Sequence, residues 1–265
     1  MKRWLVLLVA SLVVLSLSAC GASPGKVTQI DLQKQFGSFQ GTFKLYDLTN
    51  HTYKVYHPDP AGQRYSPAST FKVLHSLIAL QTGVVPDEKT VMKWDGTVYS
   101  TAEWNRDQTL TSAVQNSTIW YFQAVARQVG RDREQQYLDK VGFGNRQIGS
   151  AIDAFWLDGS LLVSVDEQLD FMTRLYKEEL PFDARAMQTV KRILVREQTS
   201  SYTLAGKTGS AVRVTPNVGW YVGYVVSDGK PYTFVTRIEG GAEASGAKAR
   251  EITDAVLGEL GLVSR

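Results

Sequence analysis

Ser69 and Lys72 are two side chains that could do chemistry together, and they lie three residues apart in a run of apolar residues. Residues at this spacing share one face of a helix, so the hydroxyl and the amine can reach each other. Burial lowers the pKa of an amine, and a neutral amine beside a hydroxyl is a base beside a nucleophile. The alternative is that Ser69 caps the helix while Lys72 extends to solvent.

The helix that must position these groups is predicted over residues 69–82. Pro67 stands just ahead of it, and Gly83 can end it in the left-handed conformation. Ser69 would then lie at a helix N-terminus, where free N–H groups and the macrodipole favour negative charge. Because the run is apolar on most of its faces, we expect the helix at the centre of the fold. His75 is interpreted as a packing or hydrogen-bonded residue rather than a base.

A second candidate cation is Lys207, in the sequence Lys207-Thr208-Gly209. A phosphate-binding loop would need glycine at position 201, which is Ser201, and would need a helix where the pattern indicates a strand. The motif therefore predicts a strand end that places a cation and backbone N–H groups along a cleft. The alternative is a solvated strand end.

Other chemistries are poorly supported by the sequence. It contains no Gly-x-Ser-x-Gly elbow, so a Ser-His-Asp triad is not expected. The three histidines show no metal-ligand spacing, and Cys20 is the single cysteine, so neither a metal site nor a disulfide is expected. The formal net charge is +3 over 265 residues and no basic run occurs, which argues against a nucleic-acid partner. The sequence favours no oligomeric state.

Strand-like patterns lie at both ends of the chain, with helical patterns between them. A β-hairpin is expected over 41–56, further strands over 202–206, 218–226 and 232–238, and helices over 111–129, 131–141, 166–177, 183–196 and 247–260. This order predicts an α+β fold, in which an antiparallel β-sheet flanked by helices carries an inserted all-helical lobe. The central helix would lie at the seam of the two parts, where ligand clefts tend to form.

Residues 1–19 have the pattern of a secretion signal, because two basic residues precede an apolar stretch that ends in Leu17-Ser18-Ala19-Cys20. This ending resembles a bacterial lipoprotein cleavage box, so we expect lipidation of Cys20. An ordinary signal peptide is the alternative. Residues 20–27 would then be a tether and residues 28–265 a single catalytic domain. We expect an exported protein, lipid-anchored at the outer surface of the cell membrane or released from it.

Taken in order, the motifs resemble the class D β-lactamases (oxacillinases) of the serine β-lactamase and penicillin-binding protein superfamily. The resemblance covers about residues 40–260. The stretches that carry it are Pro67-Ala-Ser69-Thr-Phe-Lys72, Lys93-Trp-Asp-Gly96, Trp104-Asn-Arg-Asp107, Ser117-Thr-Ile119, Phe143-Gly-Asn145, Phe155-Trp156-Leu157-Asp158-Gly159, Lys207-Thr208-Gly209 and Arg250.

The resemblance implies a small-molecule β-lactam substrate that is hydrolysed through an acyl-Ser69 intermediate. Lys72 would be N-carboxylated by carbon dioxide or bicarbonate and would act as the general base, with its carbamate held by Trp156. Ser117 and Lys207 would relay a proton to the leaving nitrogen, and no metal or other cofactor is implied. The backbone N–H groups of Ser69 and Ser210 would bind the oxyanion, while Thr208 and Arg250 would bind the substrate carboxylate. The full set of implied substrate-binding residues is Thr208, Gly209, Ser210, Arg250, Ile119 and Leu157.

Two other functions share these motifs. One is a β-lactam receptor, which is acylated once without hydrolysis, and the other is a peptidoglycan DD-peptidase. The sequence shows no transmembrane pattern beyond the signal, which argues against the receptor. The loop around Trp156 is typical of class D enzymes and argues against the peptidase. Hydrolysis is therefore the favoured interpretation.

Overall fold

A computed structural model describes residues 25–264 of the chain. The predicted signal, the lipidation site Cys20 and most of the tether lie outside these residues. Within them, the strands form one seven-stranded sheet in the order β1-β3-β2-β7-β6-β5-β4. The strands are β1 (Val27–Gln29), β2 (Gln40–Asp47), β3 (Thr52–Tyr56), β4 (Val195–Gln198), β5 (Tyr202–Ala211), β6 (Asn217–Ser227) and β7 (Lys230–Gly240).

The sheet is antiparallel except at one edge, where the three-residue strand β1 pairs parallel to β3. The expected hairpin is confirmed as β2 and β3. Its turn is organised by the Asp47 carboxylate, which accepts hydrogen bonds from the backbone N–H groups of Thr49 and Asn50. Strands β5 and β6 pair from Tyr202 opposite Ser227 to Ala211 opposite Val218.

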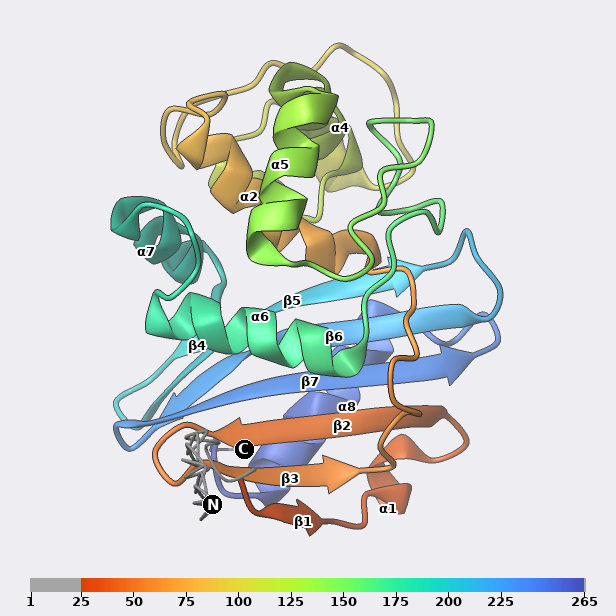
Figure 1. The fold of residues 1–265 in the computed structure, drawn as a ribbon, viewed down its shortest axis with the longest axis vertical. Coiled ribbons are helices and arrows are strands. Elements are labelled where there is room, and N and C mark those ends of the chain that lie inside the picture. The colour runs from red at the N-terminus through yellow and green to blue at the C-terminus, as the bar shows by residue number, and fades with distance from the viewer. Residues whose placement is uncertain (1–24, 265) are drawn as a thin grey trace, which may run out of the picture.

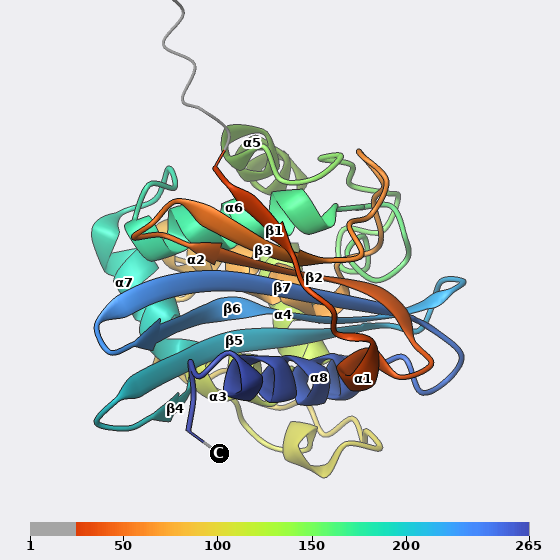
Figure 2. The same ribbon diagram turned by 90° about the horizontal axis from the view of Figure 1, so that it is seen from below.

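Helices cover both faces of the sheet (Figures 1 and 2). One side carries α6 and the inserted lobe, whereas α8 and the short α1 lie against the other. The helices are α1 (Gln33–Phe36), α2 (Lys72–Gln81), α3 (Leu110–Gln115), α4 (Ile119–Val129), α5 (Arg131–Val141), α6 (Val165–Lys177), α7 (Ala184–Ile193) and α8 (Gly246–Glu259), with 3₁₀ turns η1 (Ala68–Phe71) and η2 (Ala102–Trp104). The predicted α+β architecture with an inserted helical lobe is confirmed.

The buried hydrophobic side chains form two clusters, one on each side of the sheet. Strand β6 separates them, because successive side chains of a strand point to opposite faces. Trp220 belongs to the cluster under the helical lobe, and Tyr221 belongs to the cluster under α8. The central helix α2 is buried along nearly its whole length, as expected, with Leu74, Leu77 and Ile78 fully inaccessible to solvent.

Two predicted helices have different boundaries in the structure. The helix expected over 111–129 is broken into α3 and α4 around Ser117, whose φ of +56° lies in the left-handed region and cannot continue a helix. The helix expected over 183–196 ends at Ile193, because the chain then enters the sheet as β4. The motif Lys207-Thr208-Gly209 lies inside β5 rather than at its end.

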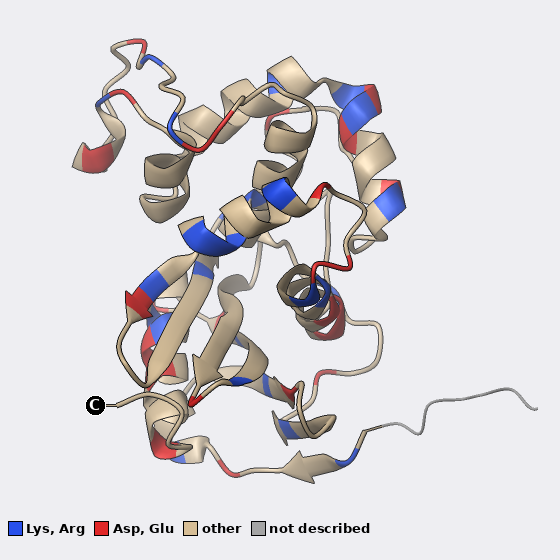
Figure 3. Ribbon diagram, turned by 90° about the vertical axis from the view of Figure 1, so that its left-hand side faces the viewer, with Lys and Arg blue, Asp and Glu red and all other residues tan. Residues whose placement is uncertain are grey.

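Within residues 25–264, no helix is long and apolar enough to cross a membrane. On the side of the molecule shown in Figure 3, basic and acidic residues are interspersed along the helices.

Candidate active site

Ser69 lies in the 3₁₀ turn η1, which leads directly into α2. The Thr70 N–H donates a hydrogen bond to the Pro67 carbonyl, and the Thr70 hydroxyl donates a second one to the same oxygen. Ala68, next to Ser69, has a φ of +46°, which is strained for a residue with a side chain. Such strain persists where surrounding contacts fix the backbone, and it occurs preferentially at functional sites.

Lys72 is fully buried, and its Nζ donates a hydrogen bond of 2.7 Å to Ser69 Oγ. Burial lowers the pKa of the Lys72 amine to about 7, because the charged form loses its hydration. The Phe122 ring lies nearby, with its centroid 5.6 Å from Nζ. A large fraction of the amine is therefore neutral near pH 7 and can act as a base or as a nucleophile. Both expectations from the spacing of Ser69 and Lys72, mutual reach and burial, are confirmed.

Trp156 is fully buried and stacks on Phe71, with ring centroids 5.8 Å apart. Its backbone carbonyl accepts a hydrogen bond of 3.1 Å from Ser66 Oγ, which ties the tryptophan loop to the segment just before Ser69. The indole Nε1 has no hydrogen-bond partner among the described residues. A buried N–H without an acceptor is energetically unfavourable, so this donor suits a group that the protein chain itself does not supply.

Ser117 and Lys207 form a second hydroxyl–amine pair. Lys207 is fully buried, and its Nζ donates hydrogen bonds to Ser117 Oγ at 3.0 Å and to the Thr208 carbonyl at 2.9 Å. The pKa of Lys207 lies well below its usual value, first because of burial and then because of the charges of Lys72 and Arg196. The two hydroxyl–amine pairs belong to one site, because β5, which carries Lys207, packs against the turn η1, which carries Ser69.

Strand β5 lies directly against the turn that carries Ser69. A Cβ atom at Gly209 would come within 2.9 Å of the Pro67 carbonyl and 3.0 Å of Thr70 Cγ2, so a side chain at this position would push the strand away. The Ser210 hydroxyl accepts a hydrogen bond from the Gly246 N–H, which fixes the strand to the start of α8. The structure thus brings Ser69, Lys207 and Ser210 to one edge of the sheet.

The comparisons with known proteins agree with this geometry. The model of the penicillin-binding protein transpeptidase domain matches residues 40–258. A probable β-lactamase, YbxI of Bacillus subtilis (strain 168), is 41% identical over 272 residues, which cover the full length of both chains. The crystal structure of a class D β-lactamase from Bacillus subtilis is 42% identical, with a TM-score of 0.84 over 89% of this chain and 98% of that one. The chain belongs to the class D β-lactamase family.

The chain is also similar to a regulatory protein of Bacillus licheniformis, BlaR1. The two are 37% identical over 226 residues, which are 85% of this chain but 37% of the regulatory protein. The family domain is therefore shared by β-lactamases and by a longer regulatory protein.

Among the residues that the class D resemblance implied, three lie at the margin of the site. Arg250 is on α8 with 45% of its side chain exposed, and its Nε lies 3.6 Å from Asp254 Oδ2. The first turn of the same helix contacts Thr208, since a Cβ at Gly246 would lie 2.9 Å from Thr208 Cβ. Ile119 opens α4 and is partly buried, while Leu157 is 6% exposed and both pack in the cluster that contains Trp156.

Two residues that contact Lys72 or His75 were not singled out from the sequence. Phe122 lies three residues after Ile119 and therefore on the same face of α4, which is a signal that could have identified it. Glu134 is fully buried 2.7 Å from His75 Nε2, and the local sequence gives no sign of this contact, because α2 and α5 are far apart in the chain. The interpretation of His75 as a packing residue agrees with its contacts to Phe71, Phe122 and Trp156.

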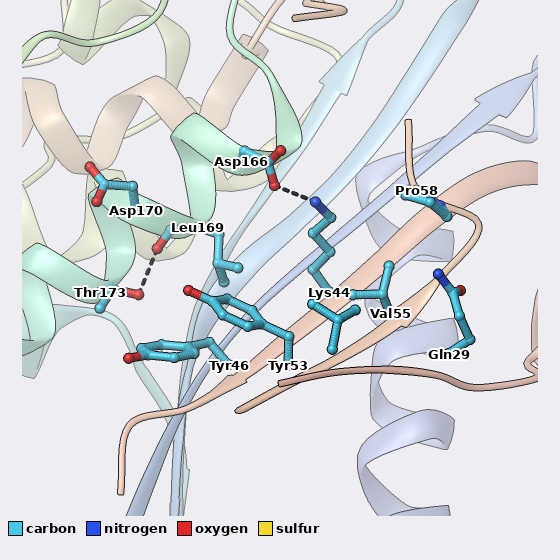
Figure 4. Close-up of a pocket in the computed structure, with 11 residues that line it drawn as sticks. Gln29, Lys44, Tyr46, Tyr53, Val55, Pro58, Asp166, Leu169, Asp170 and Thr173 are labelled. Atoms are coloured by element: carbon cyan, nitrogen blue, oxygen red, sulfur yellow. Dashed lines mark hydrogen bonds and ion pairs between the residues drawn. The ribbon is translucent and has the colours of Figure 1, made fainter. Parts of the chain in front are cut away.

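A cavity of about 570 Å³ lies between α6 and the strands β1 to β3, away from Ser69 (Figure 4). Tyr46 and Tyr53 stack on its floor, and Lys44 is paired with Asp166 at its rim. The cavity is lined by residues outside the site built around Ser69 and Lys207. Within residues 25–264, no three side chains of the types that bind metals are clustered.

Proposed function

We propose that this protein is a serine β-lactamase that hydrolyses the β-lactam amide through an acyl-Ser69 intermediate. The observation that carries the proposal is the 2.7 Å contact between Ser69 Oγ and the fully buried Nζ of Lys72, in a chain that belongs to the class D family. Ser69 itself is partly exposed, so a substrate can reach its hydroxyl while the amine beside it stays shielded from water.

In the acylation step, Ser69 Oγ attacks the lactam carbonyl carbon, and its proton goes to the base at Lys72. The negative charge on the carbonyl oxygen is bound by the backbone N–H groups of Ser69 and Ser210. The loss of one such donor typically lowers the rate by about 10²–10³. As the C–N bond breaks, Lys207 supplies a proton through Ser117 to the leaving nitrogen, a role supported by their 3.0 Å hydrogen bond.

Binding of the substrate carboxylate is assigned to Thr208 and Arg250, with Gly209 and Ser210 in the adjoining strand. The side chains of Thr208 and Arg250 are both associated with the α8 side of the sheet, where Gly246 contacts Thr208. An arginine suits this role because its planar guanidinium binds a carboxylate through two hydrogen bonds. Ile119 and Leu157 are assigned to the apolar walls.

The residues around Lys72 fit an N-carboxylated lysine. A neutral amine is needed to react with carbon dioxide, and burial brings the pKa of Lys72 to about 7. The unpartnered indole Nε1 of Trp156 provides a donor for a buried acceptor. The carbamate would supply the general base for acylation and for the attack of water on the acyl-enzyme. Phe122 lies beside Lys72 and Phe71 packs on Trp156, so these apolar rings would shield the carbamate from water.

Similarity to the regulatory protein BlaR1 supports a second candidate function, a β-lactam receptor that is acylated once. Match to the transpeptidase domain model supports a third, a peptidoglycan DD-peptidase. Steady-state hydrolysis of a chromogenic β-lactam by the purified protein, alongside cleavage of a D-Ala-D-Ala peptide, separates the three. We expect many β-lactam turnovers per Ser69 and no peptide cleavage. A single stoichiometric burst would reassign the protein as a receptor, and peptide turnover would reassign it as a peptidase.

We further propose that the protein is exported and anchored at the outer surface of the membrane through a lipid on Cys20. The proposal is supported by the sequence Leu17-Ser18-Ala19-Cys20 after an apolar stretch. Metabolic labelling with a radioactive fatty acid should label the wild-type chain and not the Cys20→Ser variant. Equal labelling of both would overturn the assignment.

A further inference from the structure

Two ionisable side chains that the proposed reaction does not use lie fully buried beside the site. His75 on α2 and Glu134 on α5 are both 0% exposed, and His75 Nε2 lies 2.7 Å from Glu134 Oε1. The nitrogens of His75 and the oxygens of Glu134 have no well-aligned hydrogen bond among the described residues. The pair is therefore a close buried contact between an imidazole and a carboxyl group that no hydrogen-bond network saturates.

The imidazole of His75 forms part of the wall around Lys72. It lies one turn beyond Lys72 on the same helix, and residues three apart share a face. Its ring packs edge-on against Trp156, with centroids 5.3 Å apart, and lies 5.6 Å from the Phe122 ring. Phe122 in turn lies 5.6 Å from Lys72 Nζ. Phe122 thus lies against both the lysine and the buried pair.

The pair has a defined polarity relative to Lys72. His75 shares a helix with the lysine, whereas Glu134 comes from α5, so the imidazole is the nearer end. Phe71, Phe122 and Trp156, which pack against the ring, carry no titratable group, and Glu134 is the titratable side chain in contact with it. The imidazole end of the pair consequently faces the lysine.

We propose that His75 and Glu134 are a positioning pair that presents an imidazolium to an anion on Lys72 and so increases the affinity of this lysine for carbon dioxide. The inference rests on the proposed carbamate. In that reaction the neutral amine attacks the carbon of carbon dioxide, an N–C bond forms as one C=O π pair moves onto oxygen, and one amine proton is released to solvent. The product carries one negative charge, which a nearby buried positive charge stabilises because little water screens it.

The test uses the full-length protein and follows the carbamate signal by ¹³C NMR during titration with ¹³C-labelled bicarbonate. Glu134→Gln keeps the shape of the side chain and removes its charge. The double variant His75→Leu/Glu134→Met removes both charges at similar volume, a change that is often neutral or stabilising for a buried pair. For both we expect half-saturation at a roughly tenfold higher bicarbonate concentration, which corresponds to about 1.4 kcal/mol. Glu178→Gln, which alters the remote pair with Lys191, is the matched control and should leave the midpoint unchanged.

Thermal unfolding of each variant is measured in parallel, because a purely structural role would change the melting temperature alone. An unchanged bicarbonate midpoint in either folded variant would overturn the positioning role. A wild-type protein without any carbamate signal would instead overturn the proposed base, together with the inference that depends on it. The two failures are therefore distinguishable.

Discussion

Replacing Lys72 by methionine should inactivate the protein and at the same time stabilise its fold near neutral pH. Burial lowers the pKa of this lysine from 10.5 to about 7. At 1.36 kcal/mol per unit, the shift corresponds to a penalty of about 4–5 kcal/mol for the charged amine in the folded state. Methionine has a similar length and no charge, so it removes this penalty. It also loses the hydrogen bond to Ser69, which is worth about 1 kcal/mol.

The destabilisation by Lys72 depends on pH in a definite direction. Because the pKa is lower in the folded state, the unfolded chain binds more protons between about pH 7 and pH 10.5. The contribution of Lys72 therefore makes the wild-type protein more stable as pH rises through this window, and its penalty is largest below pH 7. We expect Lys72→Met to raise the free energy of unfolding by about 3–4 kcal/mol at pH 7, once the lost hydrogen bond is allowed for. The gain should vanish near pH 10.

Urea denaturation in carbon dioxide-free buffer at pH 7 and pH 10 measures the difference between wild type and variant. The buffer matters because carboxylation of the wild-type lysine would change its charge. Lys191→Met is the control, since Lys191 is partly exposed and paired with Glu178, and its replacement should bring no gain. A Lys72→Met protein less stable than wild type at pH 7 would refute the argument that burial holds this amine near neutrality. So would β-lactam turnover by this variant at the wild-type rate.

Three further substitutions test separate parts of the site. Gly209→Ala places a Cβ within 2.9 Å of the Pro67 carbonyl, so kcat/KM should fall about 10²-fold as β5 moves away from Ser69. An unchanged kcat/KM would contradict the close packing of β5 against the turn that carries Ser69. Trp156→Phe keeps the stacking on Phe71 but removes the indole N–H, so activity should depend on added bicarbonate much more than in wild type. An identical bicarbonate dependence would exclude the indole as the hydrogen-bond donor to the carbamate. Ser117→Ala removes the hydroxyl that Lys207 contacts, so single-turnover acylation should slow about 10²–10⁴-fold with little change in substrate affinity. Weaker substrate binding without slower acylation would argue against the proton relay.

Local patterns predicted the elements that position the site. The apolar period and Gly83 located α2, and Gly83 has the expected left-handed φ of +71°. Alternating residues located the hairpin β2–β3 and the strands β5 to β7, because these segments are regular and long. The contact between Ser69 and Lys72 was also predictable, since both lie on one short segment and helical geometry alone brings them together.

Contacts between distant segments could not be predicted in the same way. Residues 111–129 show a helical period throughout, but the helix breaks at Ser117, whose hydroxyl accepts a hydrogen bond from Lys207, 90 residues away in the chain. The pairing of His75 with Glu134 likewise depends on how α5 packs near α2. Neither contact has a local signature. The spacing of apolar residues indicates which side chains are buried, but it does not indicate which partner a buried polar group finds.

The central claim is tested most directly by following purified protein with a chromogenic β-lactam, with and without bicarbonate, while mass spectrometry monitors the peptide that contains Ser69. The structure predicts a transient acyl group on Ser69 and many turnovers per molecule, at a rate that rises with bicarbonate. Acylation of Ser69 that reaches one equivalent and then persists, with no further product, would contradict the assignment as a hydrolase.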